Sequence, residues 1–256
     1  MLFEQVQVVR YGQERSRACG YLRGRMSSYA QQPRLDPRWV EARFDRIAST
    51  YPFFERLFLL PARSRRLAVD RLRLQAGDHV LSIGCGRGPM LPRLSKAVGA
   101  NGRVLGIDLS RRMLDAAERC VRKHALGNVD LVRANVFDHT SVDRFDAILF
   151  GFSLTSFGDP HAALDHAWRL LAPDGRLVVL DGQVPPCLVR CTRPIMPLIR
   201  RFLEATVLGD PDMRPVDAVR RLAPVEVEYF RGGAYFVISA SKPRDGRTDE
   251  RMSLPE

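Results

Sequence analysis

The chain lacks the features of several protein classes, among them disulfide-rich, zinc-binding, secreted and membrane-spanning proteins. Its five cysteines are odd in number and irregularly spaced, which argues against a disulfide framework and indicates a reducing compartment. Cys187 and Cys191 lie four residues apart, but no histidine or second cysteine pair is close enough in the sequence to complete a tetrahedral zinc site. No long apolar run follows the arginines near the start, so neither a signal peptide nor a membrane-spanning helix is expected. We therefore expect a cytoplasmic protein without a metal site.

Lysine is scarce. Lys96, Lys123 and Lys242 are the only three, although the formal net charge is +11. The positive charge is therefore carried by arginines, which are scattered along the chain. A positive field attracts polyanions nonspecifically, so nucleic acid and an anionic membrane surface stay open as partners. A scattered pattern is also typical of an arginine-rich composition without any such partner, and we favour that explanation.

The pattern of segments predicts one folding unit with additions. A chain of 256 residues suits a single α/β domain with a substantial core. Residues 1–38 are polar, arginine-bearing and interrupted by glycine and proline, which predicts a basic and partly flexible extension. The domain itself is expected over 39–242, beginning with a helical cap at 39–60. Residues 243–256 are expected to form a disordered tail.

Apolar runs typical of strands alternate with amphipathic segments through the middle of the chain. The predicted strands are 79–83, 104–107, 130–133, 145–150 and 176–180, and the predicted helices are 62–74, 89–98, 111–124, 161–171 and 215–222. Strands separated by helices pair in parallel through right-handed crossovers. Two more strands, 225–230 and 234–240, flank Gly232-Gly233 and predict a hairpin. The fold class is therefore α/β, a Rossmann-like, doubly wound, mostly parallel seven-stranded sheet with an antiparallel C-terminal hairpin strand.

The stretch VLSIGCGRGP, residues 80–89, runs from a buried strand into three alternate glycines. Gly84, Gly86 and Gly88 allow a tight turn and a close approach to a ligand at a helix N-terminus. Their G-x-G-x-G spacing, with Pro89 in place of a final glycine, departs from the dinucleotide motif and weakens a nicotinamide assignment. Asp108 ends the next strand about 20 residues further on, where an acid can accept both ribose hydroxyls.

Together with the segments that follow, these residues resemble the class I S-adenosylmethionine (SAM)-dependent methyltransferases. The resemblance is carried, in the order and spacing of that family, by VLSIGCGRG (80–88), GRVLGIDLSRRMLDAAE (102–118), NVDLVRANVFD (128–138), FDAILFGFSL (145–154) and LLAPDGRLVVLD (170–181). ARFDRIASTYPFFE (42–55) and GGAYFVISASK (232–242) are most similar to bacterial quinone and phosphatidylethanolamine methyltransferases. The resemblance implies a SAM-dependent enzyme that methylates a small molecule.

The resemblance also implies which residues bind SAM. They are Gly84, Cys85, Gly86, Gly88, Asp108, Leu109, Met113, Asn135, Val136 and Phe150. The glycines would face the methionine and ribose, and Asp108 would hold the ribose hydroxyls, although its position also suits a helix N-cap. Asn135 would reach the adenine amino group through its amide oxygen, and Val136 would offer a backbone N–H to the ring. Phe150, with Gly151, would end its strand beneath the methyl-transfer centre.

One residue departs from the resembled family. Ser82 stands where that family usually has Asp or Glu to hold the ammonium group of the cofactor. Losing such a charge-assisted bond weakens binding by roughly 1.5 to 3 kcal/mol, unless another carboxylate such as Asp45 substitutes. A SAM-binding protein with lost or altered chemistry therefore stays open as an alternative function.

The chemistry of methyl transfer asks mainly for alignment and exclusion of water. A general base is needed only for an acceptor with a high pKa. The candidates for that role are Tyr51, His161, His166, Tyr229 and Tyr235. Tyr51 and His161 are preferred as catalytic residues, His161 because it follows Asp159-Pro160 near the end of the fourth predicted strand. For each of these side chains a capping or surface role is the alternative.

The acceptor is expected to be a small, largely apolar or lipid-like molecule, such as a quinone, a lipid amine or a secondary metabolite. Aromatic residues around Tyr51 favour it, and so does the apolar, proline-broken segment 182–209, which is predicted to be a substrate lid. Arginines in that segment keep a peripheral membrane contact as an alternative. By family resemblance, amino methylation of a nucleic-acid base would call for an Asn/Asp-Pro-Pro-aromatic motif after strand 145–150, and the sequence has none there, so an RNA-modifying methyltransferase is the less favoured alternative. The oligomeric state, a homodimer included, is left open.

Overall fold

The computed structural model describes residues 8–10, 37–50, 53, 62–138, 144–183 and 214–244. Eight strands in these residues form one sheet in the order β1-β7-β8-β6-β5-β2-β3-β4. The strands are β1 (Val8–Arg10), β2 (His79–Ile83), β3 (Arg103–Asp108), β4 (Val129–Arg133), β5 (Phe145–Gly151), β6 (Leu171–Gly182), β7 (Val225–Phe230) and β8 (Tyr235–Ser241). The helices are α1 (Pro37–Ile47), α3 (Ala62–Arg71), α4 (Leu91–Val98), α5 (Arg111–Lys123), α6 (Pro160–Leu170) and α9 (Pro215–Arg220), with short 3-10 turns η2 (Val136–Asp138), η3 (Leu154–Ser156) and η5 (Arg231–Gly233).

The pairing of the strands confirms the predicted fold class. β2 pairs in parallel with β3 and β5, β3 with β4, and β5 with β6. β8 runs antiparallel between β6 and β7, and the turn that joins β7 to β8 has Gly232 and Gly233 at positive φ, as predicted. β1 is an eighth strand, antiparallel to β7. A strand of three residues is too short to show a period of two, so it was not predicted.

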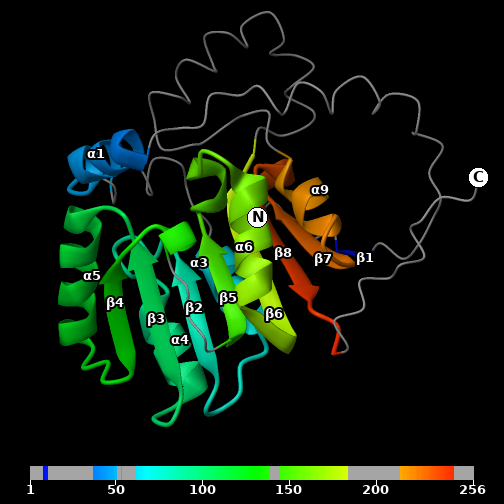
Figure 1. Cartoon of the computed structure of the whole chain (residues 1–256), viewed down its shortest axis with the longest axis horizontal. Coiled ribbons are helices and arrows are strands. Elements are labelled where there is room, and N and C mark those ends of the chain that lie inside the picture. The colour runs from blue at the N-terminus through cyan, green and yellow to red at the C-terminus, as the bar shows by residue number, and fades with distance from the viewer. Residues whose placement is uncertain are drawn as a thin grey trace, which may run out of the picture.

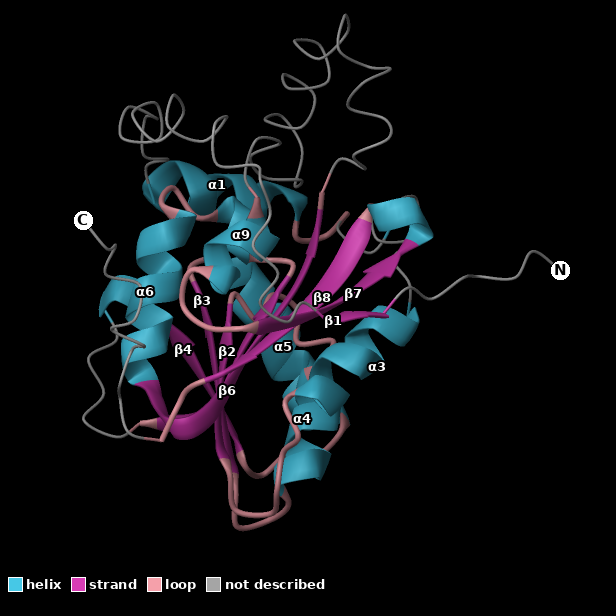
Figure 2. Cartoon of the chain, turned by 90° about the vertical axis from the view of Figure 1, so that its right-hand side faces the viewer, coloured by secondary structure: helices cyan, strands magenta, loops and turns pink. Residues whose placement is uncertain are grey.

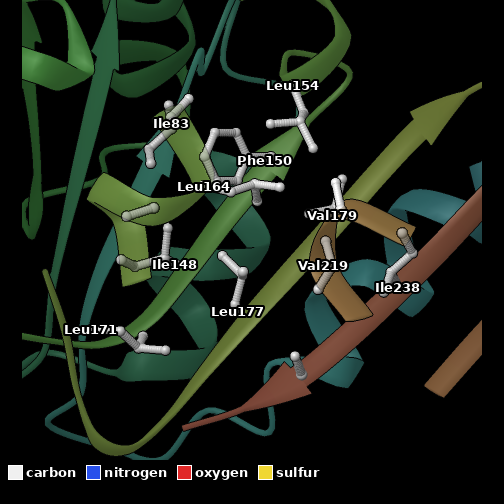
Figure 3. Close-up of a cluster of buried hydrophobic side chains, with 14 of the residues drawn as sticks. Ile83, Ile148, Phe150, Leu154, Leu164, Leu171, Leu177, Val179, Val219 and Ile238 are labelled. Carbon is white, nitrogen blue, oxygen red and sulfur yellow. The ribbon is translucent and has the colours of Figure 1, made fainter. Parts of the chain in front are cut away.

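Helices cover both faces of the sheet. Figure 2 shows α6 and α9 on one side of the strands and α3, α4 and α5 on the other. Successive strand residues point to opposite faces, and β2 follows this rule: Leu81 and Ile83 enter the cluster under α6 and α9, whereas Val80 enters the cluster under α3 and α4. Figure 3 shows the first cluster, in which Phe150 and Ile148 of β5 meet Leu164 of α6. Two packed cores therefore hold the strands in one register.

Most predicted boundaries lie within two residues of the observed ones. α4 begins at Leu91 rather than Pro89, because Met90 is its N-cap residue and Pro92 occupies the first turn. The predicted cap 39–60 is described as far as Thr50 and at Phe53. Beyond Gln183 the predicted lid 182–209 lies outside the described residues, as do residues 245–256 of the predicted tail. Among the described helices, none is both long and apolar enough to cross a bilayer.

The connections place a crevice beside β2. The chain reaches β3 and β4 on one side of β2 and β5 and β6 on its other side, and the helices that follow β2 and β5 pack on opposite faces. In doubly wound sheets, ligands bind at the carboxyl ends of the strands at such a switch point. Figure 1 shows α1, in blue, beyond the end of the sheet next to α5. The site is therefore expected between α1 and the ends of β2, β3 and β5.

Candidate active site

A cavity of about 630 Å³ lies at that position. Its walls are the glycine loop after β2 (84–87), the end of β3 (107–109), the turn after β4 (134–137) and the loop after β5 (151–153 and 156–159). Val40 and Phe44 of α1 and Arg65 of α3 complete it. The lining is mainly apolar with a few polar groups, as in small-molecule and cofactor sites of about 300 to 1,000 Å³.

The three loop glycines differ in what they do, although each has a positive φ of 57° to 79°. A Cβ on Gly86 would meet nothing within 4 Å, and Gly86 lines the cavity, so its backbone is open to a ligand. A Cβ on Gly84 would lie 2.4 Å from Cβ of Ser153, so this lining glycine also lets the loop after β5 pack closely. A Cβ on Gly88 would lie 2.7 Å from Cδ1 of Leu91.

Asp108 lies between the glycine loop and α5. Its Oδ2 accepts a hydrogen bond from the Gly86 backbone N–H (2.8 Å), and its Oδ1 accepts one from the Ser110 N–H (2.9 Å). The N-cap of α5 is Ser110, whose hydroxyl accepts from Met113 N, so the capping alternative for Asp108 is wrong. Burial raises the pKa of Asp108 to about 6, and Asp45 adds to the rise. Each carboxylate oxygen can accept a second hydrogen bond.

The other lining residues among the predicted SAM ligands surround Asp108. Leu109 and Met113 follow it, Cys85 is in the glycine loop, and Asn135 and Val136 are in the turn after β4. The Asn135 amide oxygen accepts from Phe137 N at 3.3 Å, which fixes the side chain within its own turn. Burial and the Asp108 charge raise the pKa of the Cys85 thiol, which keeps it a neutral, packed side chain.

Polar contacts hold α1 against the mouth of the cavity. The Asp45 carboxylate accepts from the Ser110 hydroxyl and from Arg112 N. The Arg87 guanidinium donates to the carbonyl of Ala48 at 2.7 Å, and Arg133 pairs with Glu41. These contacts occupy Asp45 with α5, and Asp45 does not line the cavity, which argues against its predicted role as a substitute for Ser82.

Several predicted site residues do not line the cavity. Gly88 and Phe150 are buried, Gly88 under α4 and Phe150 at 0% exposure in the core between β5 and α6. His161 is the second residue of α6, and the lining reaches Asp159 and Ala162 without it, which argues against its role as a general base. Tyr51 lies outside the described residues.

Sequence reasoning missed four residues in or beside the cavity. Arg65 and Phe152 line the cavity, with the guanidinium carbon 5.8 Å from the ring centroid of Phe152. Asp159 lines it as well while its carboxylate accepts from Ala162 N as the N-cap of α6. Asp181 at the end of β6 is buried and accepts from Thr155 N, the Thr155 hydroxyl and Gly182 N. Asp181 therefore holds η3, which adjoins the lining at Ser153 and Ser156.

The residues present fit a nucleoside cofactor. The Gly86 backbone leaves open space at the cavity wall, Asp108 keeps acceptor capacity for ribose hydroxyls, and Ile107, Leu109 and Val136 supply apolar surface for an adenine ring. Asp108 and Asp159 are the carboxylates that line the described cavity. Ser82 is buried at 2% exposure and does not line it, so any contact to the cofactor ammonium must come from another group.

Comparison with known proteins identifies the family. Residues 32–192 match the model of the ubiE/COQ5 methyltransferase family. The chain belongs to this family. It is 33% identical over 203 residues to 2-phytyl-1,4-naphtoquinone methyltransferase of Synechococcus elongatus, covering 77% of this chain and 81% of that protein. It is 31% identical over 159 residues to demethylmenaquinone methyltransferase of Lactobacillus johnsonii, covering 60% of this chain and 63% of that protein.

Solved structures agree on the fold of this ubiE/COQ5 family member. An O-methyltransferase family protein from Burkholderia thailandensis superposes with a TM-score of 0.58 at 20% identity, covering 86% of this chain and 63% of that one. A SAM-dependent methyltransferase from Aquifex aeolicus has a TM-score of 0.50 at 24% identity, covering 81% of this chain and 98% of that one. At these identities the likeness shows the class I methyltransferase fold alone.

Proposed function

We propose that this chain transfers a methyl group from SAM to a small quinone-type acceptor. The observation that carries the proposal is the cavity at the carboxyl ends of β2 and β3, where Asp108 is bonded to the Gly86 backbone. The family match supports the same cofactor. Bound SAM supplies an activated methyl group on a sulfonium, so the protein needs to bind, orient and exclude water.

The chain's own residues divide this work. The Asp108 carboxylate accepts hydrogen bonds from the ribose hydroxyls, and the hydrogen bond from the Gly86 N–H fixes this carboxylate relative to the glycine loop. Asn135 and Val136 hold the adenine side, with the Asn135 side chain set by Phe137 N. Helix α1 closes the mouth through Val40 and Phe44. These contacts leave the loop after β5 as the wall on the acceptor side.

The acceptor class rests on two supports. The Synechococcus and Lactobacillus relatives are named for phytyl-naphthoquinone and demethylmenaquinone acceptors. The wall formed by Phe152, Phe157 and Met90 is apolar and aromatic, which suits a ring system with a hydrocarbon substituent. No histidine, lysine or tyrosine of the described residues lines the cavity, and an acceptor hydroxyl of low pKa would need no such base.

Calorimetry and turnover test the proposal together. The full chain is titrated with S-adenosylhomocysteine and with NAD, and is then incubated with methyl-labelled SAM and a reduced 2-alkyl-1,4-naphthoquinone. We expect S-adenosylhomocysteine to bind and NAD not to bind. We also expect the labelled methyl group to be transferred to the naphthoquinone. Binding of NAD alone would replace the proposal with a dehydrogenase. Binding of S-adenosylhomocysteine without transfer to any quinone or other small acceptor would favour a SAM-binding protein with lost chemistry.

A further inference from the structure

A cation and an aromatic ring stand together on the acceptor side of the cavity. Arg65 is in the first half of α3 and Phe152 follows β5, and both line the cavity. The guanidinium carbon of Arg65 lies 5.8 Å from the Phe152 ring centroid, within the range of a cation–π contact. The ring therefore supports the planar guanidinium at the cavity wall.

Phe152 is itself held in place. It has a positive φ of 58°, which a bulky residue rarely adopts and which costs of order 1 to 3 kcal/mol. Its backbone N–H donates to the carbonyl of Leu180 at 2.7 Å. Its ring meets Tyr235 of β8 edge to face, with centroids 6.1 Å apart at 83°. Backbone and ring contacts thus fix the platform on which Arg65 lies.

The other charged groups of the described lining lie on the cofactor side or at the start of α6. Arg87 donates to the carbonyl of Ala48, Asp108 accepts from Gly86 and Ser110, and Asp159 caps α6. Arg65 lies beside Phe152 in the acceptor-side wall, and by this position it is the cation of the described lining that can meet an anionic group of the acceptor.

None of the titratable groups on β8, β6 and α4, the described elements that pack against α3, lines the cavity. On β8, Tyr235 is behind Phe152, and burial raises its pKa so that it stays neutral. On β6, Arg176 is grouped electrostatically with Arg71, at the C-terminal end of α3, and with Glu226 of β7. On α4, Arg93 is exposed and Lys96 is in the last turn. Among the carboxylates of the described residues, Asp108 and Asp159 line the same cavity as Arg65.

We propose that Arg65, supported by Phe152, binds the ionised hydroxyl oxygen of an aromatic acceptor and selects acceptors that can form this anion. The inference rests on the proposed function and names the group that stabilises the nucleophile. A guanidinium favours the charged form of a hydroxyl beside it and so lowers the pKa of that hydroxyl. The acceptor loses its proton to solvent on binding, which removes the need for a general base in the cavity wall.

A coloured acceptor analogue tests this assignment without turnover. The probe is 4-nitro-1-naphthol, whose anion absorbs visible light, bound to the full chain saturated with S-adenosylhomocysteine. We expect the apparent pKa of the bound probe to fall by about one unit, a tenfold shift in its ionisation. In Arg65→Gln the fall should disappear, and in Arg65→Lys a part of it should remain because the charge is kept but the planar stack is lost.

The controls separate charge from structure. Arg66→Gln removes an exposed arginine one residue away and should leave the shift unchanged. Arg65→Met keeps an apolar stem over Phe152 and replaces the glutamine variant if that one fails to fold. An equal pKa shift in wild type and in either neutral variant would overturn the assignment. Absence of S-adenosylhomocysteine binding in wild type would instead overturn the proposed function, whereas cofactor binding with an unshifted probe would overturn the Arg65 assignment alone.

Discussion

Asp108 at the end of β3 accepts a hydrogen bond from the backbone N–H of Gly86 in the loop after β2, at 2.8 Å. This bond ties together the two parts of the crevice that a nucleoside must touch. It also means that Asp108 has both a structural and a binding role. The two roles can be separated, because the chain offers a second aspartate with the same kind of structural bond.

Asp108→Asn should weaken S-adenosylhomocysteine binding by roughly 10-fold to 100-fold, the equivalent of losing hydrogen bonds to a charged group worth about 1.5 to 3 kcal/mol. The matched control is Asp146→Asn. Asp146 also accepts a backbone N–H from a neighbouring strand, that of His79 at 2.8 Å, but near the amino ends of β2 and β5 and away from the cavity. Calorimetry should find that Asp146→Asn binds S-adenosylhomocysteine with the affinity of the wild type. Equal affinities for wild type and Asp108→Asn would show that the ribose anchor is misassigned.

The raised pKa of Asp108, about 6, predicts a pH dependence. The ionised carboxylate is the stronger acceptor for ribose hydroxyls, so the dissociation constant of S-adenosylhomocysteine should rise as the pH falls below 6, by up to about tenfold per unit. Calorimetry at several pH values between about 5 and 8 measures how steeply the dissociation constant changes with pH. Asp108→Asn has no group to titrate there and should give a flat profile. A wild-type profile as flat as that of the variant would contradict the prediction.

The same shift has an opposite consequence for folding. A carboxyl whose pKa is raised in the folded state binds a proton that the unfolded chain releases. Its contribution to the free energy of unfolding is therefore fully present below the ordinary pKa of 3.8 and is lost as the pH rises through about 6. Lowering the pH from about 6 towards 3.8 therefore raises the contribution of Asp108 to the free energy of unfolding, while it weakens the binding of S-adenosylhomocysteine.

Gly86 and Gly88 separate binding from packing. Alanine at either position adopts a strained positive φ, costing of order 1 to 2 kcal/mol. In Gly86→Ala the new methyl group meets no atom within 4 Å and faces the cavity, so cofactor affinity should fall beyond the effect of the strain. In Gly88→Ala it would lie 2.7 Å from the buried Leu91, so stability should fall further. Urea unfolding and calorimetry on both variants check this, and equal loss of affinity in the two would refute the division.

The fold was predictable because its signals are local. Most of β2 and residues 177–180 of β6 are runs of mainly apolar residues buried on both faces, and the amphipathic helices between the strands repeat with a period of about 3.6 residues. The hairpin followed from Gly232-Gly233, where positive φ is needed. β1 escaped prediction because its position is set by pairing with β7, more than two hundred residues away, rather than by its own composition.

The site was predictable only in part. The glycine spacing and the strand-end acid located the crevice, but they could not tell that Gly88 packs against Leu91 or that Phe150 points into the core. The hydrophobic pattern shows which strand a residue belongs to. Which face of the sheet its side chain points to depends on how that strand is paired with its neighbours. Arg65 and Phe152 are 87 positions apart and meet only in the folded chain. Such long-range pairs leave no mark in one sequence.

Phe150 gives a test of the core that is independent of any ligand. Its side chain is 0% exposed and meets Phe157 edge to face at 6.0 Å. Phe150→Ala should lower the free energy of unfolding by about 3 to 5 kcal/mol, because the variant loses buried apolar surface and leaves a cavity. Phe53→Ala makes the same change at a side chain that is 65% exposed, and should cost about 0.5 kcal/mol or less. Urea unfolding of both variants measures the difference. Similar losses in the two would mean that Phe150 is not packed in the core of the folded protein in solution.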